Sequence, residues 1–347
     1  MADTMKAALD QTRRQYKVKQ VPMPDRFRGS ALVRVRKTGI CGSDLHMTNE
    51  RKEPQSLPSG HEVAGEVVEA PPGQHRIRPG DRVAIEMIGA GRACMECYYC
   101  RYGQYRHCRW PAPDTGGGFA EYMTRRPEGL FKLTDNLDWA DGALVEPLAV
   151  SVHGLRLGGM KPGDTVAVVG SATIGLAAIV AARAFGAARI IASARHPQQA
   201  EAAKTLGADM VTGSGKGELE DAVRNATGGL GADVTVESIG GTKIDTLQQS
   251  VDSTRPQGKV IVLGGFRDPL QFDFLKPMLN EVALVFTTCY GVIDGKHDYE
   301  VAIDLLAKGG IPFRKIVTHT YSLDDIQKGF DTAYNKSSGS IKVHITP

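Results

Sequence analysis

The stretch TVAVVGSATIGLAAIVAARAFG, residues 165–186, decides the fold of this chain. It opens with a continuous apolar run, which predicts a short buried strand over residues 165–169. The alanine-rich segment from Ile174 to Phe185 then predicts a helix, and a glycine follows to end it. A strand, a glycine-containing turn and a helix in this order form the unit in which helix amides hold a phosphate group.

The same alternation continues toward the C-terminus. Apolar runs and periodic segments predict further strands over residues 189–192, 210–212, 234–237, 259–263 and 283–287, and helices over 198–206, 218–227 and 245–251. Strands separated by helices of this length predict a doubly wound parallel sheet, so the fold class is α/β.

The N-terminal part of the chain has a different pattern. From Met5 to about Leu148 the segments are short and rich in turns, and Ala31–Arg36 alternates apolar with basic residues as a half-buried strand does. Such segments predict a small antiparallel barrel or sandwich. The alternation over Ile341–Ile345 predicts a strand that returns to this first domain.

Composition excludes several classes of protein. Hydrophobic residues make up 41% and charged residues 23% of the 347 residues, as in ordinary globular chains. A net charge of +3 is too small to indicate a nucleic-acid partner. No apolar run is long enough to span a membrane, and the N-terminus lacks a secretory pattern. We therefore expect a cytoplasmic protein whose six cysteines are thiols rather than disulfides.

Four of those cysteines form the strongest local motif, a C-x2-C-x2-C-x7-C array made of Cys94, Cys97, Cys100 and Cys108. Four thiolates on one tight loop suit tetrahedral zinc and leave no open coordination position, so this zinc would be structural. Incidental thiols and an iron–sulfur centre are the alternatives. Basic and aromatic residues flank the array, but without a wider basic face they are weak support for a nucleic-acid binder.

A second, dispersed set combines thiol, imidazole and carboxylate groups: Cys41, the pair His61-Glu62, and Glu146. A catalytic zinc needs such mixed ligands and an open position. Spacing alone does not bring these residues together. The pair also lacks the second histidine of an HExxH metalloprotease, which disfavours peptide hydrolysis.

Together these motifs resemble the zinc-containing medium-chain dehydrogenases, specifically the sorbitol and polyol dehydrogenase branch. The resemblance spans essentially the whole chain, with GICGSDLH at 39–46, GHEVAGEV at 60–67, GGFAEY at 117–122 and VEPLAV at 145–150 in order. It implies a GroES-like β-barrel catalytic domain over residues 1–153, completed by 291–347. It also implies a Rossmann dinucleotide-binding domain over 154–290, with the site in the cleft between the domains.

The resemblance assigns metal roles residue by residue. Cys41, His61 and Glu146 fall on the catalytic zinc positions. Glu62 matches an acid that ligates zinc directly in some members and by exchange in others, and our hypothesis is that it exchanges during turnover. Asp44 matches the carboxylate that orients the histidine ligand.

Ser43 and His46 match positions that relay the alcohol proton outward. The zinc is expected to act as a Lewis acid on the alcohol, and the nicotinamide to accept the hydride. Arg51 and Lys52 would suit an acidic substrate, although a surface loop is the more ordinary interpretation.

The nucleotide turn departs from GxGxxG, because Ala172 stands at the middle glycine. Its predicted contacts with the cofactor are Gly170, Ala172, Thr173, Ile174 and Gly175, followed by Ser193, Ala194 and Arg195 after the second strand. An acid normally ends that strand and binds the ribose hydroxyls. Ala194 with Arg195 beside it favours a 2′-phosphate, so NADP is predicted over NAD.

The predicted function is therefore hydride transfer between NADP, or NAD, and a secondary alcohol of a polyol, sugar alcohol or sugar acid. Two zinc ions per chain are expected. The alternatives are a 2,3-butanediol- or threonine-type dehydrogenase with NAD, and a non-catalytic nucleotide-binding protein on the same scaffold. We expect a small-molecule substrate, no nucleic-acid or membrane partner, and a homodimer or homotetramer by resemblance.

Overall fold

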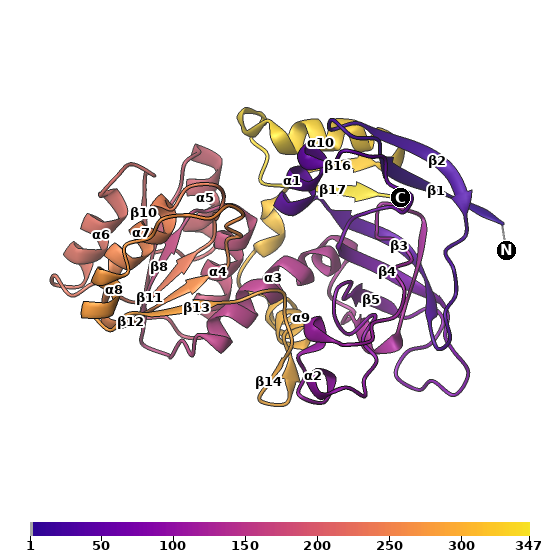
Figure 1. The fold of residues 1–347 in the computed structure, drawn as a ribbon, viewed down its shortest axis with the longest axis horizontal. Helices are drawn as coiled ribbons and strands as arrows, with labels where there is room; N and C mark the ends of the chain where they lie inside the picture. The colour runs from indigo at the N-terminus through magenta and orange to yellow at the C-terminus, as the bar shows by residue number, and fades with distance from the viewer. Residues whose placement is uncertain (1–2) are drawn as a thin grey trace. The chain divides into compact units, whose positions relative to one another are not determined.

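The computed structural model describes residues 3–347, which form two compact units (Figure 1). Of these residues, the first unit comprises 3–146, Tyr290–Lys308 and Ile316–Pro347, and the second comprises Pro147–Cys289 and Gly309–Lys315. The sequence placed the first boundary at 153/154, whereas the structure divides within the helix α3 (Trp139–Leu157). A helix that continues from one unit into the next gives no turn signal from which the sequence could locate the boundary.

The second unit is built on a six-stranded sheet in the order β10-β9-β8-β11-β12-β13, with every neighbouring pair parallel. Its strands are β8 (Thr165–Val169), β9 (Arg189–Ser193), β10 (Met210–Thr212), β11 (Ala232–Glu237), β12 (Thr254–Val262) and β13 (Ala283–Phe286). Its helices are α4 (Thr173–Ala184), α5 (Pro197–Thr205), α6 (Glu218–Ala226), α7 (Asp245–Ser253) and α8 (Leu275–Leu279). Strand order and direction confirm the predicted doubly wound Rossmann sheet.

The local sequence explains why this sheet has its turn at Gly170. This residue follows β8 with φ +90°, a backbone conformation that favours glycine. A Cβ on Gly175, in the first turn of α4, would lie 1.8 Å from the carbonyl oxygen of Gly170. The helix therefore starts close against the strand end because the residue at position 175 has no side chain.

The first unit contains a seven-stranded sheet in the order β16-β17-β3-β4-β5-β7, with β6 paired to β3. Its strands are β3 (Ala31–Gly39), β4 (Glu62–Glu69), β5 (Arg82–Ile85), β6 (Tyr122–Arg125), β7 (Leu130–Lys132), β16 (Val317–Ser322) and β17 (Lys342–Thr346). The two-stranded ribbons β1 (Thr4–Asp10)–β2 (Tyr16–Pro22) and β14 (Val292–Ile293)–β15 (Lys296–His297) complete its strands. Its helices are α1 (Gly42–Glu50), α2 (Tyr98–Arg101), α9 (Asp298–Lys308) and α10 (Ile326–Tyr334), besides the start of α3.

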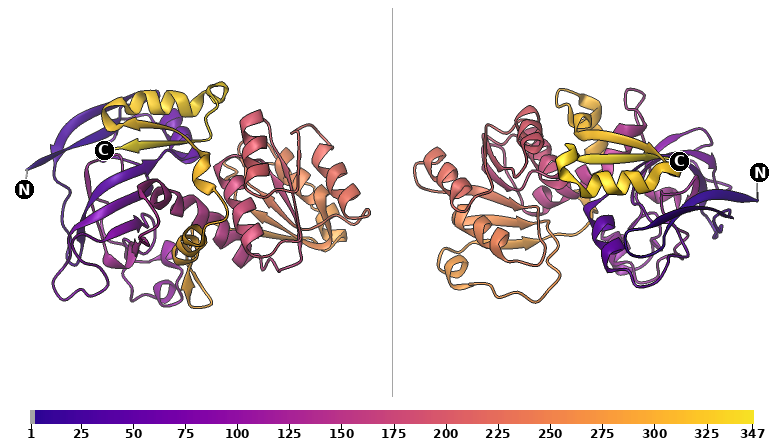
Figure 2. Two further views of the ribbon diagram at one scale, coloured as in Figure 1. Left: turned by 180° about the vertical axis from the view of Figure 1, so that it is seen from behind. Right: turned by 90° about the horizontal axis from the view of Figure 1, so that it is seen from above.

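The C-terminal strand β17 joins this sheet as the alternating pattern predicts. It lies beside β3, where His344 pairs with Gly39 in antiparallel register (Figure 2). The apolar cores on this sheet are separate clusters, one around Val33, Val63 and Ile85 and another around Phe119 and Phe330. The largely antiparallel pairing of these strands supports the predicted GroES-like fold class.

None of the helices formed by residues 3–347 is both long and apolar enough to cross a bilayer.

Candidate functional site

The candidate metal site starts where β3 ends and α1 begins. Cys41 occupies the residue before α1 in an extended conformation, and its backbone N–H donates to Asp44 Oδ2 at 2.9 Å. Asp44 is 1% exposed, so this bond fixes a buried carboxylate in the first turn of the helix. The helix start therefore positions the thiol of Cys41 and the carboxylate of Asp44 together.

The structure brings Cys41, His61 and Glu62 together, with one potential ligand atom of each lying within 4.8 Å of the others. Asp44 Oδ1 faces Nδ1 of His61 at 3.7 Å, the contact predicted for a carboxylate that orients a histidine ligand. Burial disfavours the protonated ring, but the charges of Asp44 and Cys41 outweigh it and raise the pKa of His61 well above its ordinary value. This thiol, imidazole and carboxylate set suits zinc.

Glu146 lies near this cluster but outside the group whose ligand atoms are within 4.8 Å of one another. Burial raises its pKa to about 7, and the charges of His61 and Glu62 act on it directly. The neighbouring Tyr290 side chain acts in the opposite direction to burial and lowers the pKa of Glu146. A nearby cation would stabilise the charged form of this buried carboxyl. The role of Glu146 as a zinc ligand stays a prediction.

Lys342 is a residue of the site that the sequence analysis missed. Its Nζ donates to both oxygens of Glu62, at 2.6 and 2.7 Å, and to the carbonyl oxygen of Ile40 at 2.9 Å. Both side chains of the pair are buried, at 2% and 1% exposed. A Cβ at Gly39 would lie 1.9 Å from Glu62 Oε2, so glycine at that position makes room for the carboxylate.

This pair changes the charge balance of the site. The Lys342 ammonium neutralises the Glu62 carboxylate, which leaves the Cys41 thiolate and the Glu146 carboxylate to balance a divalent cation. Any exchange of Glu62 onto the metal would compete with its hydrogen bonds to Lys342. The alternation in the closing strand would assign Lys342, between two apolar neighbours, to the solvent face, so no sequence signal pointed to its role in the site.

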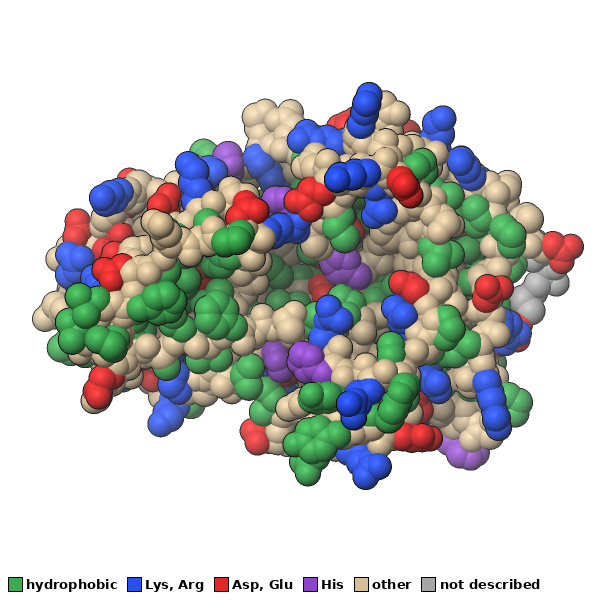
Figure 3. All heavy atoms as spheres, in the orientation of Figure 1, with side chains coloured by type: hydrophobic (Ala, Val, Ile, Leu, Met, Phe, Trp, Pro, Cys, Tyr) green, Lys and Arg blue, Asp and Glu red, His purple; other side chains and the backbone are tan. Residues whose placement is uncertain are grey.

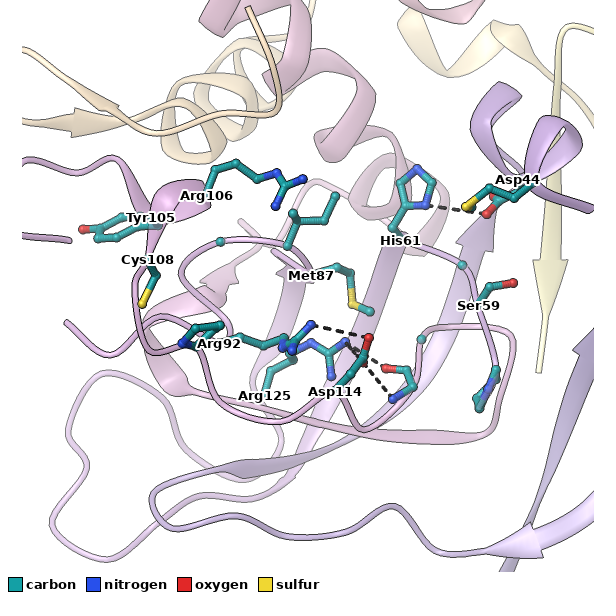
Figure 4. A pocket seen from close by; sticks show the side chains of 18 residues that line it. Asp44, Ser59, His61, Met87, Arg92, Tyr105, Arg106, Cys108, Asp114 and Arg125 are labelled. Carbon is teal, nitrogen blue, oxygen red and sulfur yellow. Dashed lines mark hydrogen bonds and ion pairs between the residues drawn. The ribbon is translucent and has the colours of Figure 1, made fainter. Parts of the chain in front are cut away.

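The predicted proton-relay residues fall in different environments. Ser43 Oγ lies 3.4 Å from Nε2 of His61, next to the metal cluster. His46 is exposed on the same helix. Arg51 pairs with Asp10 at 2.9 Å, and neither Arg51 nor Lys52 lines the pocket of about 340 Å³ that opens beside His61 (Figure 4).

The four cysteines of the predicted structural site also come together. One sulfur from each of Cys94, Cys97, Cys100 and Cys108 lies within 4.8 Å of the others, and all four are free thiols. The backbone N–H of Arg109, followed by that of Cys100, lowers the pKa of Cys97 to about 6. Burial raises the pKa of Cys100. A closed four-sulfur set of this kind fits a structural zinc.

The candidate nucleotide site lies in the second unit at the carboxyl end of β8. Ala172 stands before the first turn of α4 and provides no side-chain cap, so the amides of this helix start remain available to a phosphate. Ser193 Oγ accepts a hydrogen bond from the Gly170 N–H at 3.0 Å, and Ser171 Oγ donates to the Ser193 carbonyl at 2.8 Å. These bonds tie the glycine turn to the end of β9.

Beyond the turn, Ala194 is buried and its N–H donates to the carbonyl oxygen of Thr212 at 3.0 Å, and its contact with the cofactor stays a prediction. Arg195 is exposed and lines a cavity of about 640 Å³. Two further cations, Lys216 and Lys243, line the same cavity. Sequence reasoning missed both lysines, since they come from loops after later strands.

Residues 28–135 match the family described as "Alcohol dehydrogenase GroES-like domain", and residues 173–308 match "Zinc-binding dehydrogenase". Sorbitol dehydrogenase of Bacillus subtilis is 32% identical over 99% of this chain and 97% of its own length. L-idonate 5-dehydrogenase of Vitis vinifera is 32% identical over 90% of this chain and 86% of that protein.

Solved structures of known proteins also resemble this chain over its whole length. A zinc-binding dehydrogenase from Sinorhizobium meliloti 1021, bound to NADP, superposes with a TM-score of 0.84 at 28% identity over 100% of both chains. The family match and the two ligand clusters fit zinc and a nicotinamide nucleotide as the cofactors of this chain. With its thiol, imidazole and carboxylate cluster, its four-cysteine site and its Rossmann turn, the chain belongs to the zinc-containing medium-chain dehydrogenases and is an enzyme of the polyol dehydrogenase type.

Proposed function

We propose that this enzyme oxidises a secondary alcohol of a polyol, sugar alcohol or sugar acid with NADP⁺, and reduces the corresponding ketone with NADPH. The gathering of Cys41, His61 and Glu62 beside a pocket is the observation that carries the proposal. The sorbitol and idonate dehydrogenases among its relatives support a substrate with several hydroxyl groups.

The residues of the first unit would bind the metal, orient its histidine ligand and transfer the alcohol proton. Cys41, His61 and Glu146 would hold the zinc, which supplies Lewis acidity toward the alcohol oxygen when bound. Asp44 keeps the His61 ring oriented. Ser43, next to His61, would accept the alcohol proton and pass it toward the exposed ring of His46.

Residues of the second unit would bind the nucleotide, which accepts the hydride. The first turn of α4, from Thr173 through Ile174 to Gly175, would hold the pyrophosphate with its backbone amides. Arg195, Lys216 and Lys243 line one cavity together with three acidic residues, and of these cations Arg195, directly after β9, would face the 2′-position of the adenine ribose. No acid follows β9 to repel a 2′-phosphate, which supports NADP over NAD.

The test is steady-state kinetics with NADP⁺ and NAD⁺ on a panel of polyols, sugar acids, 2,3-butanediol and threonine. Arg195→Ala is expected to lower the preference for NADP⁺, the ratio of the two kcat/KM values, by about 10- to 100-fold, because charge-assisted bonds to the phosphate are lost. Arg224→Ala is the matched control, since this arginine pairs with Asp221 outside the cavity.

An unchanged ratio in Arg195→Ala would overturn the role of this arginine, and a preference for NAD⁺ in the unaltered enzyme would overturn the cofactor assignment. Oxidation of butanediol or threonine in preference to all polyols would favour the alternative substrates. Inactivity of the zinc-loaded enzyme on the whole panel with both nucleotides would contradict the proposed function.

We also propose that the enzyme forms a homodimer or homotetramer in the cytoplasm. Large apolar side chains are exposed on one part of the second unit, over α8 and β13 (Figure 3). They are Phe274, Leu275, Met278, Leu279 and Phe286, each between 57% and 70% exposed. Strand β13 is also an edge of its sheet, with backbone groups open to another strand.

The six free cysteines fit a reducing compartment.

A further inference from the structure

The pocket beside His61 contains more positive charge than a neutral polyol requires. It has a volume of about 340 Å³, lies wholly in the first unit, and is lined by Arg92, Arg106 and Arg125 together with His61. Figure 4 shows the three arginines around the pocket, with Asp114 beside Arg92 and Arg125. The size is sufficient for a small-molecule ligand.

Hydrogen bonds to neighbouring residues hold two of the arginine side chains in place. Arg125 is 2% exposed and donates to Thr115 Oγ1 at 3.0 Å and to the carbonyl oxygens of Thr124 and Gly116 at 2.7 and 2.8 Å. Arg92 Nε donates to the carbonyl oxygen of Ala112 at 2.9 Å.

Both of these guanidinium groups face the same carboxylate. Asp114 lies 3.4 Å from Arg92 and 3.9 Å from Arg125. One negative charge is therefore shared between two positive ones.

Arg106 has no such neutralising partner. It lies in the short 3₁₀ turn Tyr105–His107 and extends toward the Met87 side of the pocket in Figure 4. Among residues 3–347, no carboxylate forms an ion pair with its guanidinium. The other acid lining the pocket, Asp44, is buried and committed to the Cys41 N–H and to His61. The pocket thus retains an excess positive charge next to the metal cluster.

We propose that this pocket binds an anionic group of the alcohol substrate, a carboxylate or a phosphate, with Arg106 as the main specificity residue; this rests on the proposed function. A guanidinium presents paired N–H donors that match the oxygens of either group. Arg92 and Arg125 add a positive potential that attracts the same charge. The substrate class is therefore a sugar acid or a polyol phosphate rather than a neutral polyol.

The test compares sorbitol, gluconate and sorbitol 6-phosphate in the zinc-loaded enzyme with both nucleotides present in parallel assays. At least one anionic compound is expected to exceed sorbitol in kcat/KM, and the better of the two identifies carboxylate or phosphate as the group bound. Arg106→Gln is expected to lower the ratio of anionic to neutral kcat/KM by about 10- to 100-fold, mainly through the KM of the anion.

Arg109→Gln is the matched control: it removes an exposed arginine of the same loop that stacks near Trp110 and does not line the pocket. Calorimetric titration of the nucleotide-loaded enzyme with gluconate and sorbitol 6-phosphate provides a readout that does not depend on turnover. Binding that weakens in Arg106→Gln and stays unchanged in Arg109→Gln supports the inference.

Failure of this inference is distinguishable from failure of the proposed function. If sorbitol is preferred and Arg106→Gln leaves the ratio unchanged, the inference is wrong and the proposed function stands. If no alcohol is oxidised, the proposed function fails, and the titration still decides whether the pocket binds anions. Equal binding of the anions to the enzyme and to Arg106→Gln overturns the inference.

Discussion

At the scale of single residues, the buried pair of Lys342 and Glu62 is the most sensitive feature of the candidate site. Lys342→Met leaves the Glu62 carboxylate buried without its cation, which is expected to lower the free energy of unfolding by about 3–5 kcal/mol. Glu62→Met together with Lys342→Met removes both charges and is expected to recover most of that loss. Urea unfolding of the zinc-loaded protein, followed by tryptophan fluorescence, measures this, because Trp110 and Trp139 both lie in the first unit.

Lys37→Met is the matched control for this cycle, since it removes another lysine of the same sheet, whose ammonium donates to the Thr346 hydroxyl. A loss below about 1 kcal/mol in Lys342→Met would contradict the prediction. So would a double variant no more stable than the single one.

At the scale of elements, β17 is unusual because it is buried on both faces and includes a histidine. His344 is fully buried, neither ring nitrogen has a hydrogen-bond partner among the described residues, and burial, with Lys342 and Lys37 nearby, lowers its pKa well below the ordinary value. The folded chain therefore keeps the ring neutral, while the unfolded chain protonates it below about pH 6.5. Stability is lost as pH falls below that value, by about 1.4 kcal/mol per pH unit. His344→Leu is expected to remove this part of the acid sensitivity.

Unfolding free energies at pH 7.5 and 5.5 test this contribution of β17. His75→Gln, which alters an exposed histidine, is the control and should keep the acid sensitivity of the unaltered chain. Equal acid sensitivity in His344→Leu and the unaltered protein would show that another group is responsible.

At the scale of the whole molecule, the exposed apolar residues of α8 and β13 make self-association the expected state. Phe286→Glu and Met278→Glu place charges on this surface and should shift the mass in solution to that of a single chain, as measured by light scattering after size exclusion. Leu230→Glu is the control, because this leucine is 69% exposed in the second unit but lies outside the patch. A monomeric unaltered protein, or variants that keep its oligomeric mass, would refute the proposed association.

The sequence by itself determined the features that depend on local pattern. The Rossmann unit follows from apolar runs, an alanine-rich helix and a glycine that takes a positive φ at residue 170, all of which are local requirements. The four-cysteine site follows in the same way, because its ligands lie within one short loop. The closing strand over residues 342–346 was also predicted by its alternation.

Only the tertiary structure decided how distant residues meet. Cys41, His61 and Glu146 come from two strand ends and a helix, so their spacing holds no information on distance and only the resemblance suggested that they belong together. Lys342 reaches Glu62 from 280 residues away. The excess positive charge of the pocket, assigned to Arg106, can be recognised only once Asp114 is known to pair with Arg92 and Arg125. Ligand sets and charge balance depend on contacts between elements, and a linear pattern specifies only the elements themselves.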